Sequence, residues 1–199
     1  MDIDNFVMPL FRANGDTRSF AGTAFCIDGH LITAAHVLDR ESTFYALNGS
    51  HWIPLEYSRW LPKQPATVDK HGFDVAFYPV PALRSPLSLA DADAEPHDEM
   101  DIVCWQWKPD GLRQVATRGL VLEENDEKGY IRLATVDKIT HGSSGCPIFR
   151  DGKVFGIMAM GRDFVETKGL PPLPGRLEQN TCWAFKASHI RRLMPDERK

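Results

Sequence analysis

Short apolar segments separated by turn-forming residues run along the whole chain and most constrain its fold. Fourteen prolines and fifteen glycines are spread among these segments in a chain of 199 residues. Proline and glycine interrupt long helices, and short apolar runs between turns are typical of strands. We therefore predict an all-β sandwich or barrel. Strands are expected over residues 6–10, 22–27, 30–33, 43–47, 52–57, 73–80, 100–107, 114–123, 129–135, 148–149, 154–160 and 182–186, and a short helix capped by Ser188 over 188–194.

Composition limits the organisation of the chain and its partners. A hydrophobic share of 43% suits one globular unit, or two small lobes that share a core. Residues 83–98 are rich in Pro, Ala and Asp, which predicts the connection between two lobes. The net charge of -4, without a dense Lys/Arg stripe, argues against a nucleic-acid partner. No apolar run approaches the roughly 20 residues of a membrane helix, so no membrane partner is expected.

The cysteines bear on metal binding and on location. Cys26, Cys104, Cys146 and Cys182 lie far apart, and the chain has neither a Cys-x-x-Cys nor a His-Glu-x-x-His motif. We therefore expect neither a metal nor a cofactor. The N-terminal residues lack the apolar core of a secretion signal, so we predict reduced, mostly buried thiols and a cytoplasmic location. A secreted chain whose signal has been removed is the alternative.

The segment Gly142-Ser143-Ser144-Gly145-Cys146-Pro147 is the first candidate for chemistry. Glycine lets the backbone bend sharply and lets a substrate come close. Such a turn can expose the Ser144 hydroxyl and bring the amides of Gly142 and Ser144 together, as the oxyanion of an acyl transfer requires. The alternative is an ordinary Gly/Ser loop. Because Cys146 stands where a second glycine would be, the Gly-x-Ser-x-Gly elbow of α/β-hydrolases fits poorly.

Two further side chains stand in contexts that suit a serine nucleophile. His36 follows a predicted strand and two alanines, which leave room for an imidazole; the alternative is a buried histidine satisfied by backbone carbonyls. Asp74 lies in an apolar segment, where a carboxylate is costly unless it is paired. The alternative is an aspartate that points into water at a strand edge, which the flanking Phe73 and Val75 make less attractive. His141 is a rival base, but it precedes Ser144 by three residues and a tight turn gives it a poor approach.

Taken together, these signals resemble the trypsin/chymotrypsin-fold serine peptidases, particularly the cytosolic and HtrA-like branch. The resemblance is carried by residues 22–25, 31–37, 74–76, 142–147 and 156–157. It implies two six-stranded antiparallel β-barrels, over about 5–90 and 99–187, a short C-terminal helix, and catalytic residues in the cleft between the barrels. It also implies roles for four residues: Ser144 as nucleophile, His36 as general base and then acid, Asp74 as the residue that orients His36, and the amides of Gly142 and Ser144 as the oxyanion hole.

Departures from the family pattern concern activation and specificity. Ser143 replaces the usual Asp or Asn, so activation by an ion pair with a new N-terminus is excluded. By similarity, the substrate pocket is formed by Lys138, Thr140, His141, Met158, Ala159, Met160, Gly161 and Cys182. Lys138 stands where trypsin-like enzymes carry a basic-selecting Asp, which predicts an uncharged or acidic residue before the cut. The alternative is that Lys138 points into solvent.

These observations predict an intracellular serine endopeptidase of restricted specificity that acts on a protein or peptide substrate. Because no zymogen device is evident, we expect control either by a regulatory protein partner or by the loop over residues 162–181. Residues 162–179 of this loop lie outside those that the structure describes. Two alternatives remain at this point. One is a trypsin-fold binding module that has lost turnover because Ser143 and Cys146 disturb the oxyanion geometry, and the other is an esterase that uses the same triad.

Overall fold

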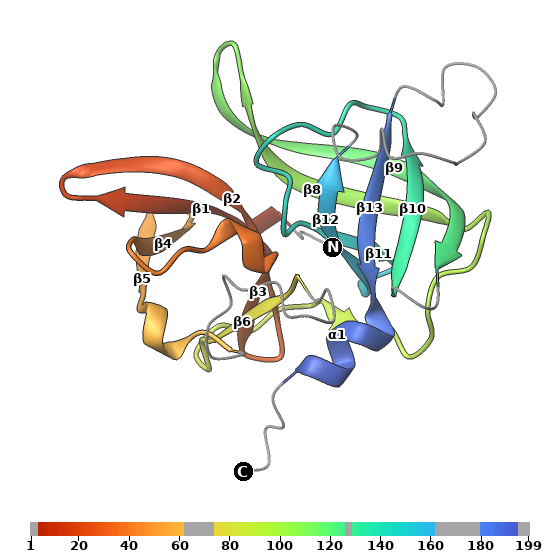
Figure 1. Ribbon diagram of the computed structural model, residues 1–199, viewed down its shortest axis with the longest axis horizontal. Helices are drawn as coiled ribbons and strands as arrows, with labels where there is room; N and C mark the ends of the chain where they lie inside the picture. Colours follow the sequence, from red (N-terminus) through yellow and green to blue (C-terminus); the bar gives the residue numbers. More distant parts are fainter. Residues whose placement is uncertain (1–3, 62–73, 126–128, 162–179, 195–199) are drawn as a thin grey trace.

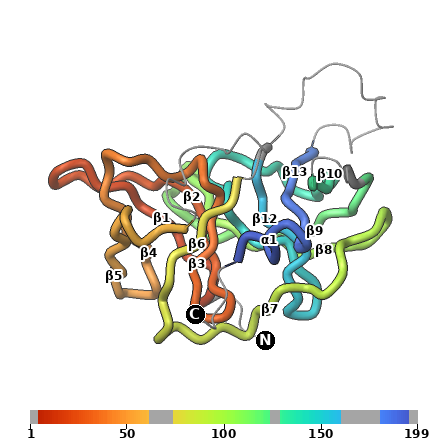
Figure 2. The backbone as a smooth tube through the Cα atoms, turned by 60° about the horizontal axis from the view of Figure 1, so that its bottom comes forward, coloured from red at the N-terminus to blue at the C-terminus, as the bar shows by residue number. Residues whose placement is uncertain are grey.

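The computed structural model describes residues 4–61, 74–125, 129–161 and 180–194, which form two antiparallel β-sheets side by side and one short helix. The first half of the chain makes one sheet and the second half makes the other (Figure 1). Seen from a second direction, the two sheets remain on opposite sides of the molecule (Figure 2). The prediction of an all-β fold in two lobes is confirmed.

The N-terminal sheet has six strands in the order β5-β4-β1-β2-β3-β6. Its strands are β1 (Val7–Asn14), β2 (Thr17–Ile27), β3 (His30–Thr33), β4 (Thr43–Asn48), β5 (His51–Leu55) and β6 (Ala76–Pro79), with 3-10 turns η1 (Asp4–Phe6), η2 (Ala35–Val37) and η3 (Tyr57–Arg59). The β2–β3 hairpin turns at Asp28 and Gly29, both with positive φ (45° and 71°), as Asp-Gly turns favour. The sheet curls without closing: beyond η3, Leu61 exchanges two 2.8 Å backbone hydrogen bonds with Phe77 of β6, an isolated bridge outside the named strands.

The C-terminal sheet closes on itself. Its six closing strands run β11-β8-β9-β10-β13-β12, and β12 pairs again with β11, while β7 adds in parallel to β12. The strands are β7 (Ser88–Leu89), β8 (Glu99–Lys108), β9 (Gly111–Asn125), β10 (Tyr130–Thr135), β11 (Pro147–Arg150), β12 (Lys153–Gly161) and β13 (Thr181–Lys186). The segment expected to connect the lobes therefore also contributes a strand to the second lobe.

Three apolar cores hold these sheets. One fills the N-terminal sheet around Trp60 and Phe44, and another fills the C-terminal barrel around Leu133 and Ile148. The third core lies between the sheets and is formed by residues of both. Its members are Val7, Phe25, Ile27, Ile32, Val75, Phe77, Leu87, Val103, Phe149, Val154, Ile157, Ala159, Phe185 and Ile190. Because burial of apolar area is the main stabilising term, this shared core fixes how the two sheets face each other.

The predicted C-terminal helix is present as α1 (Ala187–Leu193), but Ser188 does not cap it. Ser188 lies inside the first turn, where its backbone N–H and its hydroxyl donate to Asp93 at 2.9 and 2.7 Å. The first N–H groups of a helix lack partners within the helix, and a carboxylate satisfies them well. The cap prediction was wrong because Asp93, 95 residues earlier, supplies that acceptor.

Candidate active site

The Ser144 loop consists of two consecutive tight turns. The Thr140 carbonyl accepts from the Ser143 N–H at 3.2 Å, and the Ser143 carbonyl accepts from the Cys146 N–H at 3.0 Å. The third residue of each turn is a glycine with positive φ, 97° at Gly142 and 86° at Gly145. This combination is the signature of type II turns, in which glycine is favoured at that position. The three-residue spacing of the glycines therefore follows from two turns that share Ser143.

The N-terminal sheet holds this loop through Thr23 of β2. The Thr23 N–H donates to the Ser144 carbonyl at 2.9 Å, and the Thr23 hydroxyl donates to the Gly142 carbonyl at 2.7 Å. The same hydroxyl accepts the Trp105 N–H from β8 at 3.0 Å, and Thr33 donates to the Thr23 carbonyl at 2.7 Å. Thr23 is fully buried. One side chain thus ties β2, β8 and the Ser144 loop together.

The loop also fits closely against its surroundings. A Cβ at Gly145 would lie 2.2 Å from the Thr23 carbonyl oxygen and 2.3 Å from the Thr33 hydroxyl. A Cβ at Gly142 would lie 2.1 Å from the Phe20 ring. Gly145 is therefore required by space as well as by φ, whereas at Gly142 a side chain would be strained by φ and would displace the Phe20 ring. Within the described part of the chain, neither the Gly142 N–H nor the Ser144 N–H donates to a backbone carbonyl, so both amides remain free to bind a ligand.

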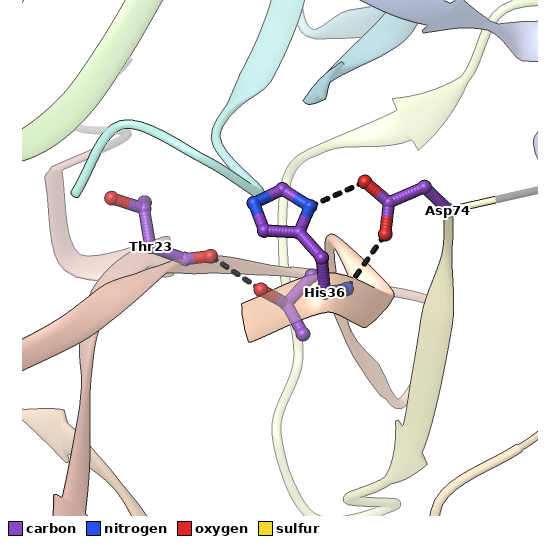
Figure 3. A network of polar contacts seen from close by, with 4 residues as sticks. Thr23, His36 and Asp74 are labelled. Carbon is purple, nitrogen blue, oxygen red and sulfur yellow. Dashed lines mark hydrogen bonds and ion pairs between the residues drawn. The ribbon is translucent and has the colours of Figure 1, made fainter. Parts of the chain in front are cut away.

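His36 and Asp74 form a pair beside this loop. Asp74 Oδ1 accepts the His36 backbone N–H at 2.7 Å, and Oδ2 accepts a hydrogen bond from His36 Nδ1 (Figure 3). A carboxylate can only accept, so the hydrogen resides on Nδ1 and Nε2 is left as a base. The Ala35 N–H also donates to the Asp74 carbonyl at 3.2 Å. The Asp74 side chain is 9% exposed and that of His36 is 40% exposed, so the pair presents only the imidazole to solvent.

His36, Ser144 and Gly142 line one cavity of about 230 Å³, which lies where the sheets meet. The other lining residues are Arg12, Phe20, Ala21, Val37, Trp107 and His141. A larger cavity, of about 580 Å³, lies on the C-terminal sheet around Thr117 and Thr135 and includes none of these residues. The smaller cavity is the one that brings a serine, a histidine and free amides together.

Beneath the Ser144 loop lies a buried polar cluster in the C-terminal barrel. Gln106 Nε2 donates to Ser143 Oγ at 2.9 Å, and Ser143 Oγ donates to Cys104 Sγ at 3.3 Å. The Cys146 thiol also donates a hydrogen bond to Cys104. This bond is the largest of the contributions that lower the pKa of Cys104, to about 7. Burial raises the pKa of Cys146 well above its ordinary value. Ser143 therefore occupies a buried, hydrogen-bonded site where the family pattern has a carboxylate or amide side chain.

The other predicted substrate-binding residues are distributed around the loop. His141 is exposed and lines the cavity of Ser144, Lys138 is exposed, and Thr140 is half-buried. Met158 of β12 and Cys182 of β13 are fully buried members of the C-terminal core, and burial raises the Cys182 pKa. The other three predicted residues are Ala159, which is buried between the sheets, and Met160 and Gly161, which end β12.

Thr23, Gln106 and Trp107 are candidate functional residues that sequence reasoning did not single out. Thr23 lies within residues 22–25, which carry the family resemblance, but its sequence context predicts no role because its partners are distant in sequence. Gln106 carries a usable signal, since it interrupts the apolar run over residues 102–107 and a buried polar side chain needs a partner. In the described part of the chain, no group of three or more His, Cys, Asp or Glu is arranged to hold a metal ion. None of the described helices has the length and apolar character needed to cross a membrane.

Comparison with known proteins identifies the family. The model of the trypsin-like peptidase domain matches residues 22–157. Among solved structures, the active form of the Rv3671c protease from M. tuberculosis has a TM-score of 0.66 at 17% identity, over 96% of this chain and 80% of its own. A serine endoprotease from Yersinia pestis has a TM-score of 0.68 at 13% identity, over 94% and 61%. Neuropsin, a serine protease of mouse brain, has 0.63 at 14% identity, over 94% and 92%.

At these identities the structural likeness shows the fold. A search of curated protein sequences gave no match. The family model covers residues on both sheets, including the Ser144 loop and the His36–Asp74 pair. The chain therefore belongs to the trypsin-like peptidase domain family, with the chymotrypsin-like fold of the serine endopeptidases.

Proposed function

We propose that Ser144, His36 and Asp74 form the catalytic triad of this serine endopeptidase, with the amides of Gly142 and Ser144 as its oxyanion hole. The observation that carries the proposal is the shared cavity: Ser144 and His36 line it together, and Asp74 holds His36 from behind. A serine hydroxyl is a weak nucleophile near neutrality, so it needs a base of this kind.

In the proposed reaction, Ser144 Oγ attacks the carbonyl carbon of the scissile peptide bond, and its proton passes to His36 Nε2. The resulting imidazolium is stabilised by Asp74, which stays ionised. Negative charge on the carbonyl oxygen is met by the free N–H groups of Gly142 and Ser144. His36 then protonates the leaving amine as the C–N bond breaks. A water molecule releases the acyl group by the same steps, with Ser144 Oγ as the leaving group.

The proposed substrate preference, location and control of the enzyme rest on separate observations. An exposed Lys138 close to the Ser144 loop supports a preference for an uncharged or acidic residue before the cut. The four cysteines are free and buried, which supports a cytoplasmic location, where thiols stay reduced. A buried, neutral Ser143 supports control by a regulatory protein partner rather than by an ion pair with a new N-terminus.

Labelling with a fluorophosphonate probe tests the triad. The wild type should be labelled, whereas Ser144→Ala should not be labelled, and His36→Ala should be labelled orders of magnitude more slowly. Ser58→Ala, which removes an exposed serine in η3, is the matched control and should be labelled as the wild type. Full activity in His36→Ala with none in His141→Ala would overturn the assignment of the base.

Cleavage of a diverse peptide library separates the three functional classes. Peptide hydrolysis that depends on Ser144 supports the endopeptidase. Labelling with ester hydrolysis but no peptide cleavage would instead assign an esterase. Absence of labelling in a folded wild-type protein would assign a binding module that has lost turnover.

A further inference from the structure

The outer face of the N-terminal sheet carries aromatic side chains where a water-facing sheet surface is usually polar. Phe11 of β1 lies directly opposite Phe20 of β2 and Tyr45 of β4, so all three point to the same side. The neighbours Leu10 and Phe44 point inward and are fully buried in the N-terminal core. The three rings therefore face outward.

Two tryptophans extend this row at its ends. Trp107 of β8 packs edge-on against Phe20, with ring centroids 6.4 Å apart, and Trp52 of β5 packs against Phe11 at 5.0 Å. Trp107 is 61% exposed and Trp52 is 39% exposed. We call Trp107, Phe20, Phe11, Tyr45 and Trp52 the aromatic face. The strands β1, β2, β4 and β5 that carry most of it lie together in the N-terminal sheet (Figures 1 and 2).

The aromatic face begins inside the cavity that holds the catalytic residues. Phe20 and Trp107 line that cavity together with His36 and Ser144. The Phe11 ring follows at 6.0 Å from Phe20. The surface is thus continuous from the reacting groups to Trp52, and an extended chain advancing about 3.3 Å per residue would cover it with roughly four residues.

A cation lies at the far end of this face. The Arg18 guanidinium stacks over Trp52 and Tyr45, 4.4 and 4.6 Å from their ring centroids. Within the described residues no carboxylate forms an ion pair with Arg18, whereas Arg12 is paired with Asp39 at 3.1 Å. The stacked Arg18 is therefore available to bind an acidic group from another molecule.

We propose that the aromatic face binds the segment of the protein substrate that follows the cleaved bond, and that it selects apolar or aromatic side chains there, followed by an acidic residue at Arg18. This inference rests on the proposed triad. The imidazolium of His36 must protonate the leaving amine, so the leaving segment lies on the His36 side of Ser144. Among the described side chains expected to contact the acyl segment, only His141 lines this cavity, whereas Phe20 and Trp107 both do. Exposed aromatic side chains and arginine are also the residues that contribute most at interfaces.

Quenched fluorescent peptides test the proposal. One set shares the acyl half, chosen from the library cleavage, and differs only after the cut: one peptide carries two aromatic residues followed by glutamate, one carries lysine in place of glutamate, and one carries only glycine and serine. The wild type should cleave the aromatic-acidic peptide with a kcat/KM at least about tenfold above that for the glycine-serine peptide.

Two variants and a control locate the selectivity. Trp52→Ala should lose most of the preference for aromatic residues, and Arg18→Glu should reverse the preference between glutamate and lysine. Arg118→Glu makes the same charge change on the exposed C-terminal sheet, where its side chain is 71% exposed, and should keep the wild-type preference. Equal kcat/KM values for the three peptides in the wild type, or unchanged preferences in both Trp52→Ala and Arg18→Glu, would overturn the proposal.

Fluorophosphonate labelling keeps this test separate from the triad. The probe carries no leaving peptide, so Trp52→Ala and Arg18→Glu should be labelled at the wild-type rate. Labelling that is lost in Ser144→Ala but unaccompanied by any preference after the cut would reject the aromatic face and leave the triad standing. Absence of labelling in the wild type would reject the triad instead.

Discussion

The Thr23 hydroxyl donates a 2.7 Å hydrogen bond to the Gly142 carbonyl, although the two residues are 119 positions apart in sequence. The Thr23 N–H holds the Ser144 carbonyl as well, at 2.9 Å. Two of the peptide groups around the nucleophile are therefore oriented by one buried residue of the opposite sheet. These peptide groups directly follow Gly142 and Ser144, so the N-terminal sheet holds, from the carbonyl side, the two residues whose N–H groups meet the oxyanion.

Replacing Thr23 with valine should lower kcat by about tenfold to a hundredfold and leave KM nearly unchanged. Valine keeps the shape of threonine but removes the donor to the Gly142 carbonyl, so Gly142, whose N–H meets the oxyanion, is held less firmly. Complete loss of an oxyanion donor costs about 10²–10³ in rate, and a misplaced donor should cost less. Thr23→Ser keeps the hydroxyl and should retain most of the kcat. Steady-state kinetics on one peptide substrate gives the two constants.

A stability measurement distinguishes this positioning role from a merely structural one. Thr23→Val leaves the buried Trp105 N–H without its acceptor and should also lower the free energy of unfolding, by about 1–3 kcal/mol. If Thr23→Ser were as slow as Thr23→Val, or if kcat were unchanged in a folded Thr23→Val, the positioning role of the hydroxyl would be refuted.

Replacing a glycine of the Ser144 loop with alanine should be more damaging than replacing a glycine of an open turn. Gly145→Ala places a methyl group 2.2 Å from the Thr23 carbonyl oxygen at a residue with φ of 86°, so the loop must move or the variant must unfold. We expect destabilisation above about 3 kcal/mol and loss of fluorophosphonate labelling. Gly15→Ala is the control: its φ is 60°, but nothing lies within 4 Å of the added Cβ. It should cost only the strain of a positive φ, roughly 1–2 kcal/mol, as measured by urea unfolding.

The candidate catalytic residues could be predicted from sequence because their signals are local. The two glycines around Ser144 specify tight turns, the alanines before His36 allow close packing, and an aspartate in an apolar segment needs a partner. The supports of these residues were not predictable in the same way. Thr23 and Asp93 act on residues 119 and 95 positions away, so their roles depend on which strands lie side by side in space.

The aromatic face could not be predicted from the sequence either. Phe11, Phe20 and Tyr45 each look like core residues in sequence, and their burial depends on which face of the strand they take.

The predicted strands are shorter than the strands of the structure in two hairpins. The β1–β2 and β8–β9 hairpins extend beyond the core as exposed, polar ribbons, where the apolar alternation used for prediction is missing.

Asp74→Asn should lower kcat by about 10⁴ if Asp74 orients His36 as proposed. The amide retains an oxygen for the His36 backbone N–H, but its NH₂ group then faces Nδ1 and favours the tautomer with the hydrogen on Nε2. In that tautomer Nε2 cannot accept the Ser144 proton. Steady-state kinetics at neutral pH measures the loss, and Asp101→Asn, an exposed aspartate on β8, is the control. A folded Asp74→Asn with more than a tenth of the wild-type kcat would rule out this role.

Asp98 makes the stability of the C-terminal lobe depend on pH. Its carboxylate accepts from Arg150 Nη1 at 2.8 Å and from the Glu95 N–H at 3.0 Å, and these contacts, with the Arg150 hydrogen bond the larger, lower the Asp98 pKa below its ordinary value of 3.8. At a pH between the folded and unfolded pKa values of Asp98, the carboxyl is protonated in the unfolded chain but ionised in the folded one. The contribution of Asp98 is therefore fully present above about pH 4 and is lost as the pH falls through the folded pKa.

Asp98→Asn should accordingly be less stable than the wild type near neutral pH, with a difference that shrinks as the pH is lowered below about 4. Urea unfolding at a series of pH values measures this convergence. Asp110→Asn removes a partner from a mostly exposed pair with Arg113, whose side chains are 65% and 60% exposed, and such pairs contribute little to stability. A constant difference between Asp98→Asn and the wild type across the acidic range would show that the Arg150–Asp98 contact carries no proton linkage, because only a shift in pKa between folded and unfolded chains makes the difference vary with pH.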